Sequence, residues 1–191
     1  ATVAAPAGYS QAAMQAMKPA TATRLPATKP DIIVVMSESF WDPTRLPGVQ
    51  FSEDPIPTTR ALSSGHIFSP EFGGMTANVE FEALTGFSNA FLPFGGIPYQ
   101  QYVRRPVPSL ASFLGSEGYT TRALHPYRGW FWNRKTVYEQ LGFQTFESEE
   151  TLPKLTKRGG QVGDLVFGEE IIRQAEAARE PFFFFAVTIQ G

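Results

Sequence analysis

Two unbroken runs of apolar residues constrain the fold of this chain more than any other feature. Residues 32–36 read IIVVM, and residues 182–187 read FFFFAV. A continuous apolar run of strand length is typical of a strand in a parallel sheet that is buried on both faces. We therefore expect a fully buried strand at 32–36 and a final strand at 182–189.

Helical and extended patterns alternate in the second half of the chain. Ser109 is placed to cap a helix that Gly118 ends, and Gly142 is placed to end the next helix. The expected elements are helices at 76–84, 109–117, 134–141 and 163–179 and a strand at 119–124. Strands that alternate with helices predict an α/β domain with a mainly parallel sheet flanked by helices.

Proline-rich segments indicate the domain organisation. Residues 1–30 are rich in Ala, Thr and Pro, so we expect a flexible linker with one short helix around 10–17. Residues 31–191 are expected to form one domain, because a chain of this length can bury a single full core. Segments 42–60 and 86–106 contain many prolines and are expected to be loops.

Composition excludes several classes of function. The net charge of -2 gives no indication of a nucleic-acid partner, which would require a basic surface. The chain has no cysteine, which excludes disulfides, thiolate metal sites and a cysteine nucleophile. No apolar run reaches the roughly 20 residues that span a bilayer, and the N-terminus does not read as a signal peptide. Any membrane attachment is therefore expected through a segment outside this chain.

Glu38 directly follows the first predicted strand, in the sequence SESFWD. Ligands of open parallel sheets bind at the carboxyl edge of the strands, where this side chain is expected. A carboxylate there suits a hard divalent cation. The alternative is an ordinary solvated or capping glutamate, and position alone favours that alternative.

Thr76 is expected to open a helix after a pair of glycines, in the sequence GGMTANVEF. The glycines let the backbone turn tightly and come close to a ligand. A hydroxyl at a helix N-terminus lies in positive potential, which favours a bound phosphate and an alkoxide nucleophile. Thr76 is also an ordinary capping residue, with Glu80 near capping-box spacing, so the sequence alone favours the cap.

A third candidate segment begins at His125, where a predicted strand ends, and reads HPYRGWFWNR. Arginine binds phosphate through two parallel hydrogen bonds, and tryptophan offers a flat face to a small polyol. Arg134 and Trp132 are therefore candidate ligand-binding residues. The alternative is that the aromatic residues belong to the core, that Arg134 opens a surface helix and that His125 is structural.

Two acidic features and two glycine pairs carry weaker signals. Asp164 is a weak candidate, and the acidic run at 147–150 is expected to be a solvated loop. The glycine pairs at 95–96 and 159–160 match no phosphate-loop pattern, so a nucleotide-binding fold is not expected.

Taken in order, three segments resemble one family. IIVVMSESFWD, GGMTANVEFEALTG and HPYRGWFWNRKTVYEQLGF are similar to the extracytoplasmic domain of lipoteichoic acid synthases and related phosphoglycerol transferases. These enzymes belong to the sulfatase and alkaline phosphatase superfamily. The resemblance covers about residues 31–190 and implies that superfamily's α/β fold, with 31–191 as the N-terminal portion of the catalytic domain.

The resemblance implies roles for residues that match the family's motifs. Glu38 matches a metal ligand, and Thr76 matches a nucleophile that also binds the metal. Trp132 and Arg134 match residues that hold the glycerol phosphate head group, and His125 lies in the same segment. The implied cofactor is a divalent metal, usually manganese, with magnesium as the other candidate.

The implied reaction moves a phosphoglycerol group from phosphatidylglycerol to a glycan or polyol-phosphate acceptor through a phospho-threonine intermediate. The implied partners are a lipid donor of the phosphatidylglycerol type and a glycan or teichoic-acid-like acceptor. The implied location is extracytoplasmic, in the periplasm or on the outer face of a bacterial membrane.

Two departures from the family pattern bear on this expectation. Tyr127 stands where some members carry an acidic residue, two positions after the histidine. The family's Asp-His metal pair and a further substrate histidine would follow beyond Gly191. Glu38 and Thr76 supply two ligands where transition-metal sites need about four. We therefore expect this chain alone to bind metal weakly and to turn over little or nothing.

Two other readings of the sequence stay open. One is a phosphoethanolamine transferase or phosphodiesterase of the same superfamily, although the FWNR segment and the absence of cysteine favour a phosphoglycerol enzyme. The other is a non-catalytic sulfatase-like module that binds a glycan or a lipid head group. A sulfatase that uses a modified cysteine is excluded, because the chain has none.

Overall fold

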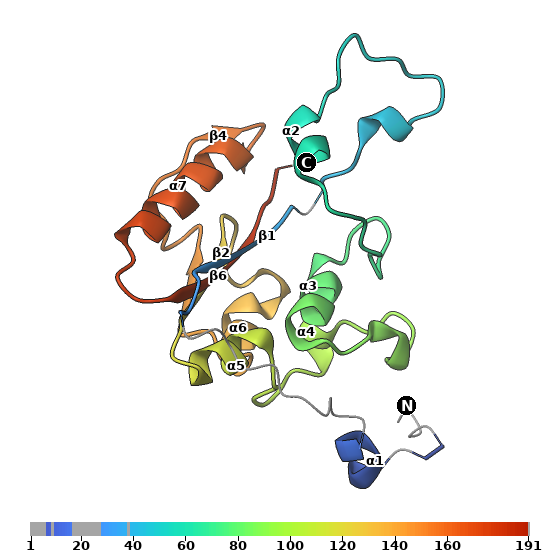
Figure 1. Ribbon diagram of the computed structural model, residues 1–191, viewed down its shortest axis with the longest axis vertical. Helices are drawn as coiled ribbons and strands as arrows, with labels where there is room; N and C mark the ends of the chain where they lie inside the picture. The colour runs from blue at the N-terminus through green and yellow to red at the C-terminus, as the bar shows by residue number, and fades with distance from the viewer. Residues whose placement is uncertain (1–6, 9, 17–27, 38, 191) are drawn as a thin grey trace.

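A four-stranded parallel sheet forms the centre of the molecule, in a computed structural model that describes residues 7–8, 10–16, 28–37 and 39–190 (Figure 1). Its strands lie in the order β1-β6-β2-β3 and all pair in parallel. Their bounds are Ile32–Met36 for β1, Thr120–His125 for β2, Thr145–Ser148 for β3 and Phe182–Val187 for β6. The predicted α/β fold, with a mainly parallel sheet flanked by helices, is confirmed.

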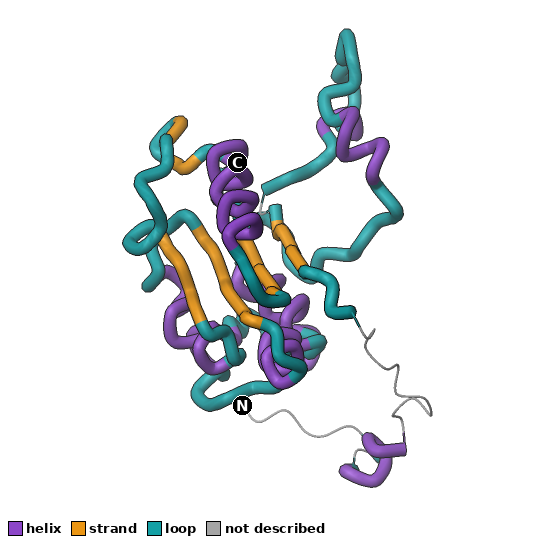
Figure 2. The backbone as a smooth tube through the Cα atoms, turned by 60° about the vertical axis from the view of Figure 1, so that its left-hand side comes forward, coloured by secondary structure: helices purple, strands orange, loops and turns teal. Residues whose placement is uncertain are grey.

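Helices cover the two faces of this sheet (Figures 1 and 2). On one face lies α7 (Asp164–Ala177), and on the other lie α3 (Thr76–Thr85), α5 (Leu110–Ser116) and α6 (Arg134–Gln140). The shorter elements are α1 (Gln11–Ala16), α2 (Pro57–Leu62), α4 (Pro98–Gln101), the 3-10 turns η1 (Pro43–Arg45), η2 (Asn89–Phe91) and η3 (Phe131–Asn133), and the antiparallel pair β4 (Lys157–Arg158) and β5 (Gln161–Val162). None of the helices described is both long and apolar enough to cross a bilayer.

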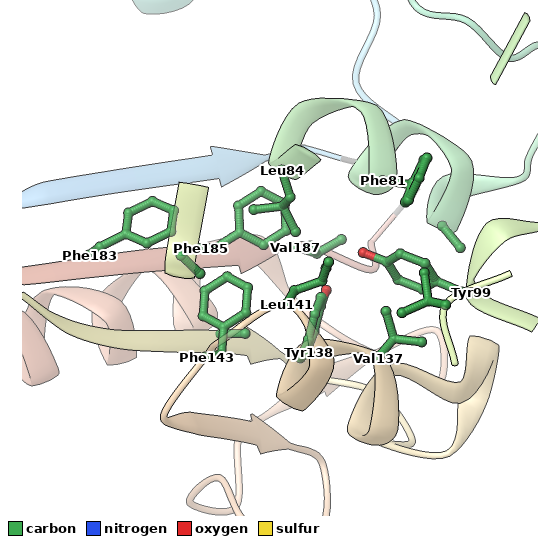
Figure 3. Packing of buried hydrophobic residues seen from close by; sticks show 14 of the residues in the cluster. Phe81, Leu84, Tyr99, Val137, Tyr138, Leu141, Phe143, Phe183, Phe185 and Val187 are labelled. Carbon is green, nitrogen blue, oxygen red and sulfur yellow. The ribbon is translucent and has the colours of Figure 1, made fainter. Parts of the chain in front are cut away.

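Strand β6 joins the two hydrophobic cores. Phe183, Phe185 and Val187 point to the side of α6, where Figure 3 shows them beside residues of α6 and of the turn that follows it. The alternate residues Phe182 and Phe184 pack in the second core, against α7. This alternation follows from the two-residue period of a strand, and it explains why every position of β6 is apolar.

Strand β1 differs from its prediction. The run IIVVM was expected to be buried on both faces, but Ile33, Val34 and Val35 are exposed, with 53% of Val35 accessible. The reason is topological, since among the described residues β1 pairs only with β6 and is the edge of the sheet. The expectation of a fully buried strand is therefore wrong for this chain.

Capping residues explain why the helices begin and end where they do. Ser109 caps α5 as predicted, and its hydroxyl accepts a hydrogen bond from the Ser112 amide. Gly142, predicted to end the next helix, follows α6 with φ of 87°. The helix expected around 10–17 is α1, where the Ser10 hydroxyl accepts from Ala13 N, and position 17 lies outside the described residues.

The acidic run at 147–150 is only in part a solvated loop. Glu147 belongs to β3, where its carboxylate lies 3.3 Å from Arg122 of β2 and accepts a hydrogen bond from Gln174 of α7. Glu150 accepts from the Gly129 amide. Polar residues occupy β3 because it is the other edge of the sheet, and Glu147 is paired across the strands. Residues 149–150 form the turn after β3, and Glu150 is exposed. The expectation of a solvated loop is therefore wrong for 147–148 and confirmed for 149–150.

The two long segments expected to be loops contain short helices. Segment 42–60 extends away from the sheet (Figures 1 and 2) and includes η1 and the first residues of α2. There Arg60 pairs with Asp42 and Asp54 at 3.0 and 2.7 Å. Hydrogen bonding to Arg60 lowers the pKa of both carboxyl groups. Segment 86–106 similarly contains η2 and α4.

Candidate active site

The carboxyl edge of the sheet brings together residues that are far apart in sequence. The Thr188 amide, just after β6, donates a hydrogen bond of 3.0 Å to the Met36 carbonyl at the end of β1. His125, the last residue of β2, lies 2.9 Å from the Val187 carbonyl at the end of β6. This edge is where ligands bind in open parallel sheets. The strand ends therefore define the place to look for a site.

Thr76 is the first residue of α3, and its side chain is buried. The N-cap position belongs to Met75, which has the left-handed backbone angles φ 62° and ψ 38° and makes no side-chain capping bond. A left-handed conformation is strained for a residue with a side chain, and such strain concentrates at functional sites. The reading of Thr76 as the N-cap is wrong, and its hydroxyl stands at the positive end of the helix instead.

A cavity of about 860 Å³ lies between the start of α3 and the end of β1. Thr76 lines it, and so do Ser37 and Ser39, the two neighbours of position 38. Glu38 itself lies outside the described residues, so the pairing of Glu38 with Thr76 stays a prediction. The segment that carries Glu38 and the helix that carries Thr76 nevertheless border one cavity.

Asp164 was a weak candidate in the sequence, and the structure places it close to this region. It lines a second cavity, of about 430 Å³, together with Ser37, Ser39 and Gln190. Burial raises the pKa of its carboxyl group, and a hydrogen bond from the Gln190 backbone opposes this effect in part. The Asp164 amide, the first of α7, donates to the Gln190 side chain. No sequence pattern could have indicated this placement, because it depends on the tertiary fold, which puts the start of α7 beside the end of β1.

The backbone at Trp132 and Asn133 is unusual. Both residues have positive φ, 58° and 60°, in the turn that leads into α6. The Asn133 side chain donates to the Tyr99 carbonyl at 3.2 Å, which helps to hold this turn. Trp132 is half-buried and packs against the core, with its ring 5.2 Å from that of Phe131. Its predicted contact with a head group stays a prediction.

Arg134 does not open a surface helix, because only 1% of its side chain is exposed. Its Nε and Nη2 donate to Glu80 of α3, at 3.1 Å and 2.6 Å from Oε1, and the Tyr138 hydroxyl donates to the other oxygen of Glu80 at 2.6 Å. Burial lowers the pKa of the guanidinium, but the Glu80 carboxylate, together with Tyr138 and Tyr99, outweighs this effect and raises the pKa above its ordinary value. Arg134 is therefore a buried cation, one of whose nitrogens, Nη1, has no hydrogen-bond partner among the described residues.

His125 is completely buried at the end of β2. Burial and the positive charge of Arg134 lower the pKa of its ring to about 3, so the imidazole is neutral near pH 7. Its Nδ1 lies 2.9 Å from the Val187 carbonyl, which can only accept, so Nδ1 carries the proton and Nε2 is an acceptor. That Nε2 has no partner within the described part of the chain. His125 thus offers an acceptor, rather than a charge, to a ligand.

The lowered pKa of His125 predicts a pH dependence of stability. Between pH 6.5 and about pH 3 the unfolded chain binds a proton at this residue that the folded chain excludes. The free energy of unfolding should therefore fall with decreasing pH in this window, by at most about 1.4 kcal/mol per pH unit. In His125→Asn, denaturant unfolding at several pH values should show a correspondingly smaller slope. An unchanged slope would contradict a buried neutral histidine.

The residues described so far supply part of a metal site at most. Within the described ranges, no three His, Asp or Glu side chains lie together as a metal-binding group. The hydroxyl oxygen of Thr76 and the carboxylate of Glu38 are the kind of donors that a hard divalent cation takes. The donor chemistry therefore fits a divalent cation, while further ligands would have to come from other residues.

The chain is similar in sequence to known proteins over most of its length. The sequence profile of the sulfatase family matches residues 30–191. A protein of Rhizobium meliloti (strain 1021) that is named for cyclic beta-1,2-glucan modification is 61% identical over 193 residues, which cover 100% of this chain and 30% of that protein. An uncharacterized protein of Haemophilus influenzae is 30% identical over 129 residues, or 64% of this chain and 23% of that protein. The chain thus spans a third or less of these relatives.

Two solved structures share the fold. A phosphoglycerol transferase of Streptococcus pyogenes, GacH, solved in complex with sn-glycerol-1-phosphate, is 27% identical with a TM-score of 0.74, over 85% of this chain and 44% of the other. The lipoteichoic acid synthase LtaP of Listeria monocytogenes is 24% identical with a TM-score of 0.71, over 85% and 41%. With the profile match over residues 30–191 and the parallel sheet flanked by helices, the chain belongs to the sulfatase family.

Proposed function

We propose that this chain carries the nucleophile and the phosphate-binding arginine of a phosphoglycerol transferase. One observation carries the proposal: Thr76 begins α3 at a cavity bordered by both neighbours of Glu38. A sulfatase-type cysteine nucleophile is excluded by composition, which leaves a hydroxyl to attack phosphorus. The likeness to the phosphoglycerol transferase GacH supports the same substrate class.

In the proposed reaction, the Thr76 hydroxyl oxygen attacks the phosphorus of a phosphatidylglycerol-type donor. The bond to diacylglycerol breaks, its oxygen leaves with the electron pair and takes up a proton, and the phosphoglycerol group stays on Thr76. An acceptor hydroxyl then attacks the same phosphorus, and Thr76 regains its proton. The positive end of α3 and the cation Arg134 stabilise the charge on the phosphoryl oxygens.

We also propose that a divalent cation, manganese or magnesium, is held in part by Glu38 and Thr76. When bound, such an ion lowers the pKa of a coordinated hydroxyl and screens the charge of a phosphodiester. Residues beyond the pair would complete its ligand set, because about four ligands are typical. Support comes from the oxygen donors at this edge of the sheet and from the resemblance of the SESFWD and GGMTANVEF segments.

For the acceptor, we propose a glucan on the extracytoplasmic side of a bacterial membrane. The relative at 61% identity, named for the modification of cyclic beta-1,2-glucan, supports this choice over a teichoic acid. The net charge of the chain, -2, does not support a nucleic-acid partner, which would call for a basic surface.

Donor lipids that differ only in head group test the proposed function in the full-length protein. We expect diacylglycerol release from phosphatidylglycerol to be at least about tenfold faster than from phosphatidylethanolamine, because the site recognises the head group. Chelation with EDTA should stop release, and added manganese should restore it. Faster release from phosphatidylethanolamine would favour a phosphoethanolamine transferase. No release from any lipid by the metal-loaded protein would favour the non-catalytic binding module.

A further inference from the structure

The ion pair between Glu80 and Arg134 connects two parts of the candidate site. Thr76 and Glu80 are four residues apart on α3, so they lie on the same face of the helix, one turn from each other. Arg134 is the first residue of α6, which follows β2 in the chain. The pair is separated by 54 residues in sequence, and both side chains are buried, with 1% of Arg134 and 0% of Glu80 exposed.

Glu80 holds the guanidinium in one orientation. Its Oε1 accepts from Nη2 and Nε of Arg134, and its Oε2 is also 3.3 Å from Nε. A carboxylate that engages two nitrogens of a planar guanidinium fixes the plane of that group as well as its position. Tyr138 donates its hydroxyl to Oε2, which in turn restrains the carboxylate.

This arrangement leaves Nη1 of Arg134 buried and without a hydrogen-bond partner among the described residues. An unsatisfied buried donor is costly, and a charged donor more so, which calls for an explanation. The acceptor Nε2 of His125 is likewise buried and has no hydrogen-bond partner among the described residues. After burial, the positive charge of Arg134 is the next cause that lowers the pKa of that ring. A buried donor without a partner, at the start of α6, and a buried acceptor without a partner, at the end of β2, thus both belong to the carboxyl edge of the sheet.

We infer that Glu80 is a positioning residue that orients Arg134 so that its Nη1 can take an oxygen of the donor phosphate. In this role Glu80 does not contact the substrate but acts through the guanidinium of Arg134. Because Glu80 and Thr76 both belong to α3, the same helix positions the guanidinium and the threonine hydroxyl. The inference rests on the proposed function, because it requires that Arg134 binds the phosphate of a ligand. A purely structural ion pair between α3 and α6 is the competing role.

Calorimetric titration of the full-length, manganese-loaded protein with sn-glycerol-1-phosphate separates the two roles. If Glu80 positions Arg134, Glu80→Gln should weaken the affinity by about tenfold or more, with a stoichiometry like that of the unaltered protein. If Glu80 is only structural, part of the Glu80→Gln protein should unfold, which lowers the number of binding sites per molecule. The part that stays folded should bind sn-glycerol-1-phosphate with unaltered affinity. Unaltered affinity in Glu80→Gln would overturn the inference.

Two further variants keep the test decisive if Glu80→Gln does not fold. Glu80→Asp keeps the charge but shortens the side chain, so it cannot hold both nitrogens of Arg134 in place. We expect it to fold and to bind sn-glycerol-1-phosphate more weakly, and unaltered affinity would again contradict the positioning role. Glu170→Gln is the matched control, because it makes the same change in another buried glutamate, which pairs with Arg173 on α7 on the opposite face of the sheet. Its affinity should stay within about threefold of the unaltered protein, since it leaves the Glu80–Arg134 pair intact.

The titration also distinguishes this inference from the proposed function. If affinity for sn-glycerol-1-phosphate depends on Glu80 but no lipid releases diacylglycerol, the transferase proposal fails and the positioning role stands. If lipid turnover is present and the affinity is independent of Glu80, the positioning role fails alone. If the unaltered protein releases diacylglycerol but does not bind sn-glycerol-1-phosphate, the positioning role likewise fails alone.

Discussion

Replacing Thr76 by alanine in the full-length protein should reduce phosphoglycerol transfer on the order of 10³-fold or more. The reason is that the side chain would supply the attacking oxygen, so its removal deletes a covalent step. Diacylglycerol release from phosphatidylglycerol measures the loss. Intact-protein mass spectrometry should also detect a phosphoglycerol adduct on the unaltered protein and none on Thr76→Ala.

Thr76→Ser is the matched control for this prediction. It keeps a hydroxyl at the first position of α3, so it should retain measurable transfer and still form the adduct. Thermal unfolding of both variants shows whether the fold survives, since Thr76 is buried. Undiminished transfer by a folded Thr76→Ala protein would place the nucleophile elsewhere.

Phe185→Ala should produce the largest loss of stability among core substitutions in β6. The side chain is 1% exposed and lies 6.4 Å from the Tyr138 ring and 6.2 Å from the Phe143 ring, so truncation leaves a cavity between sheet and helices. Such changes typically cost about 3–5 kcal/mol in free energy of unfolding. Denaturant unfolding followed by circular dichroism measures the effect.

An exposed phenylalanine provides the comparison for Phe185. Phe113 lies on α5 with 51% of its surface accessible. We expect Phe113→Ala to change the free energy of unfolding by about 0.5 kcal/mol or less, because little apolar contact is lost. Equal losses in the two variants would mean that β6 is not the centre of the core.

Local chemistry explains how much of the fold was predictable. The apolar run at 182–187 predicted β6 because a strand with helices on both faces needs an apolar residue at every position. Ser109 predicted the start of α5, and Gly118, with φ of 83°, its end, because caps act over one helical turn. Strand β3 was missed, because its residues TFES carry no such pattern and its place depends on β2.

The candidate site was predictable only in part, for a related reason. Motif resemblance selected Thr76, His125 and Arg134, and the structure places the last two close enough for the charge of Arg134 to act on the ring of His125. It could not show that Arg134 is buried, because its partner Glu80 lies 54 residues away. Spacing alone also misassigned Thr76 as a cap, since the strained backbone of Met75 takes that position.

The exposed edge of β1 has a consequence for handling the protein. Among the described residues its outer side has no paired strand, and the run IIVVM contains neither charge nor proline. A row of unsatisfied amides and carbonyls beside an apolar surface is a template for intermolecular strand addition and fibril-like stacking. Lys29, Pro30 and Asp31 stand just before the run as the kind of gatekeeper residues that oppose such growth. We therefore expect these three residues to limit strand addition at the open edge of β1 when the polypeptide is handled in isolation.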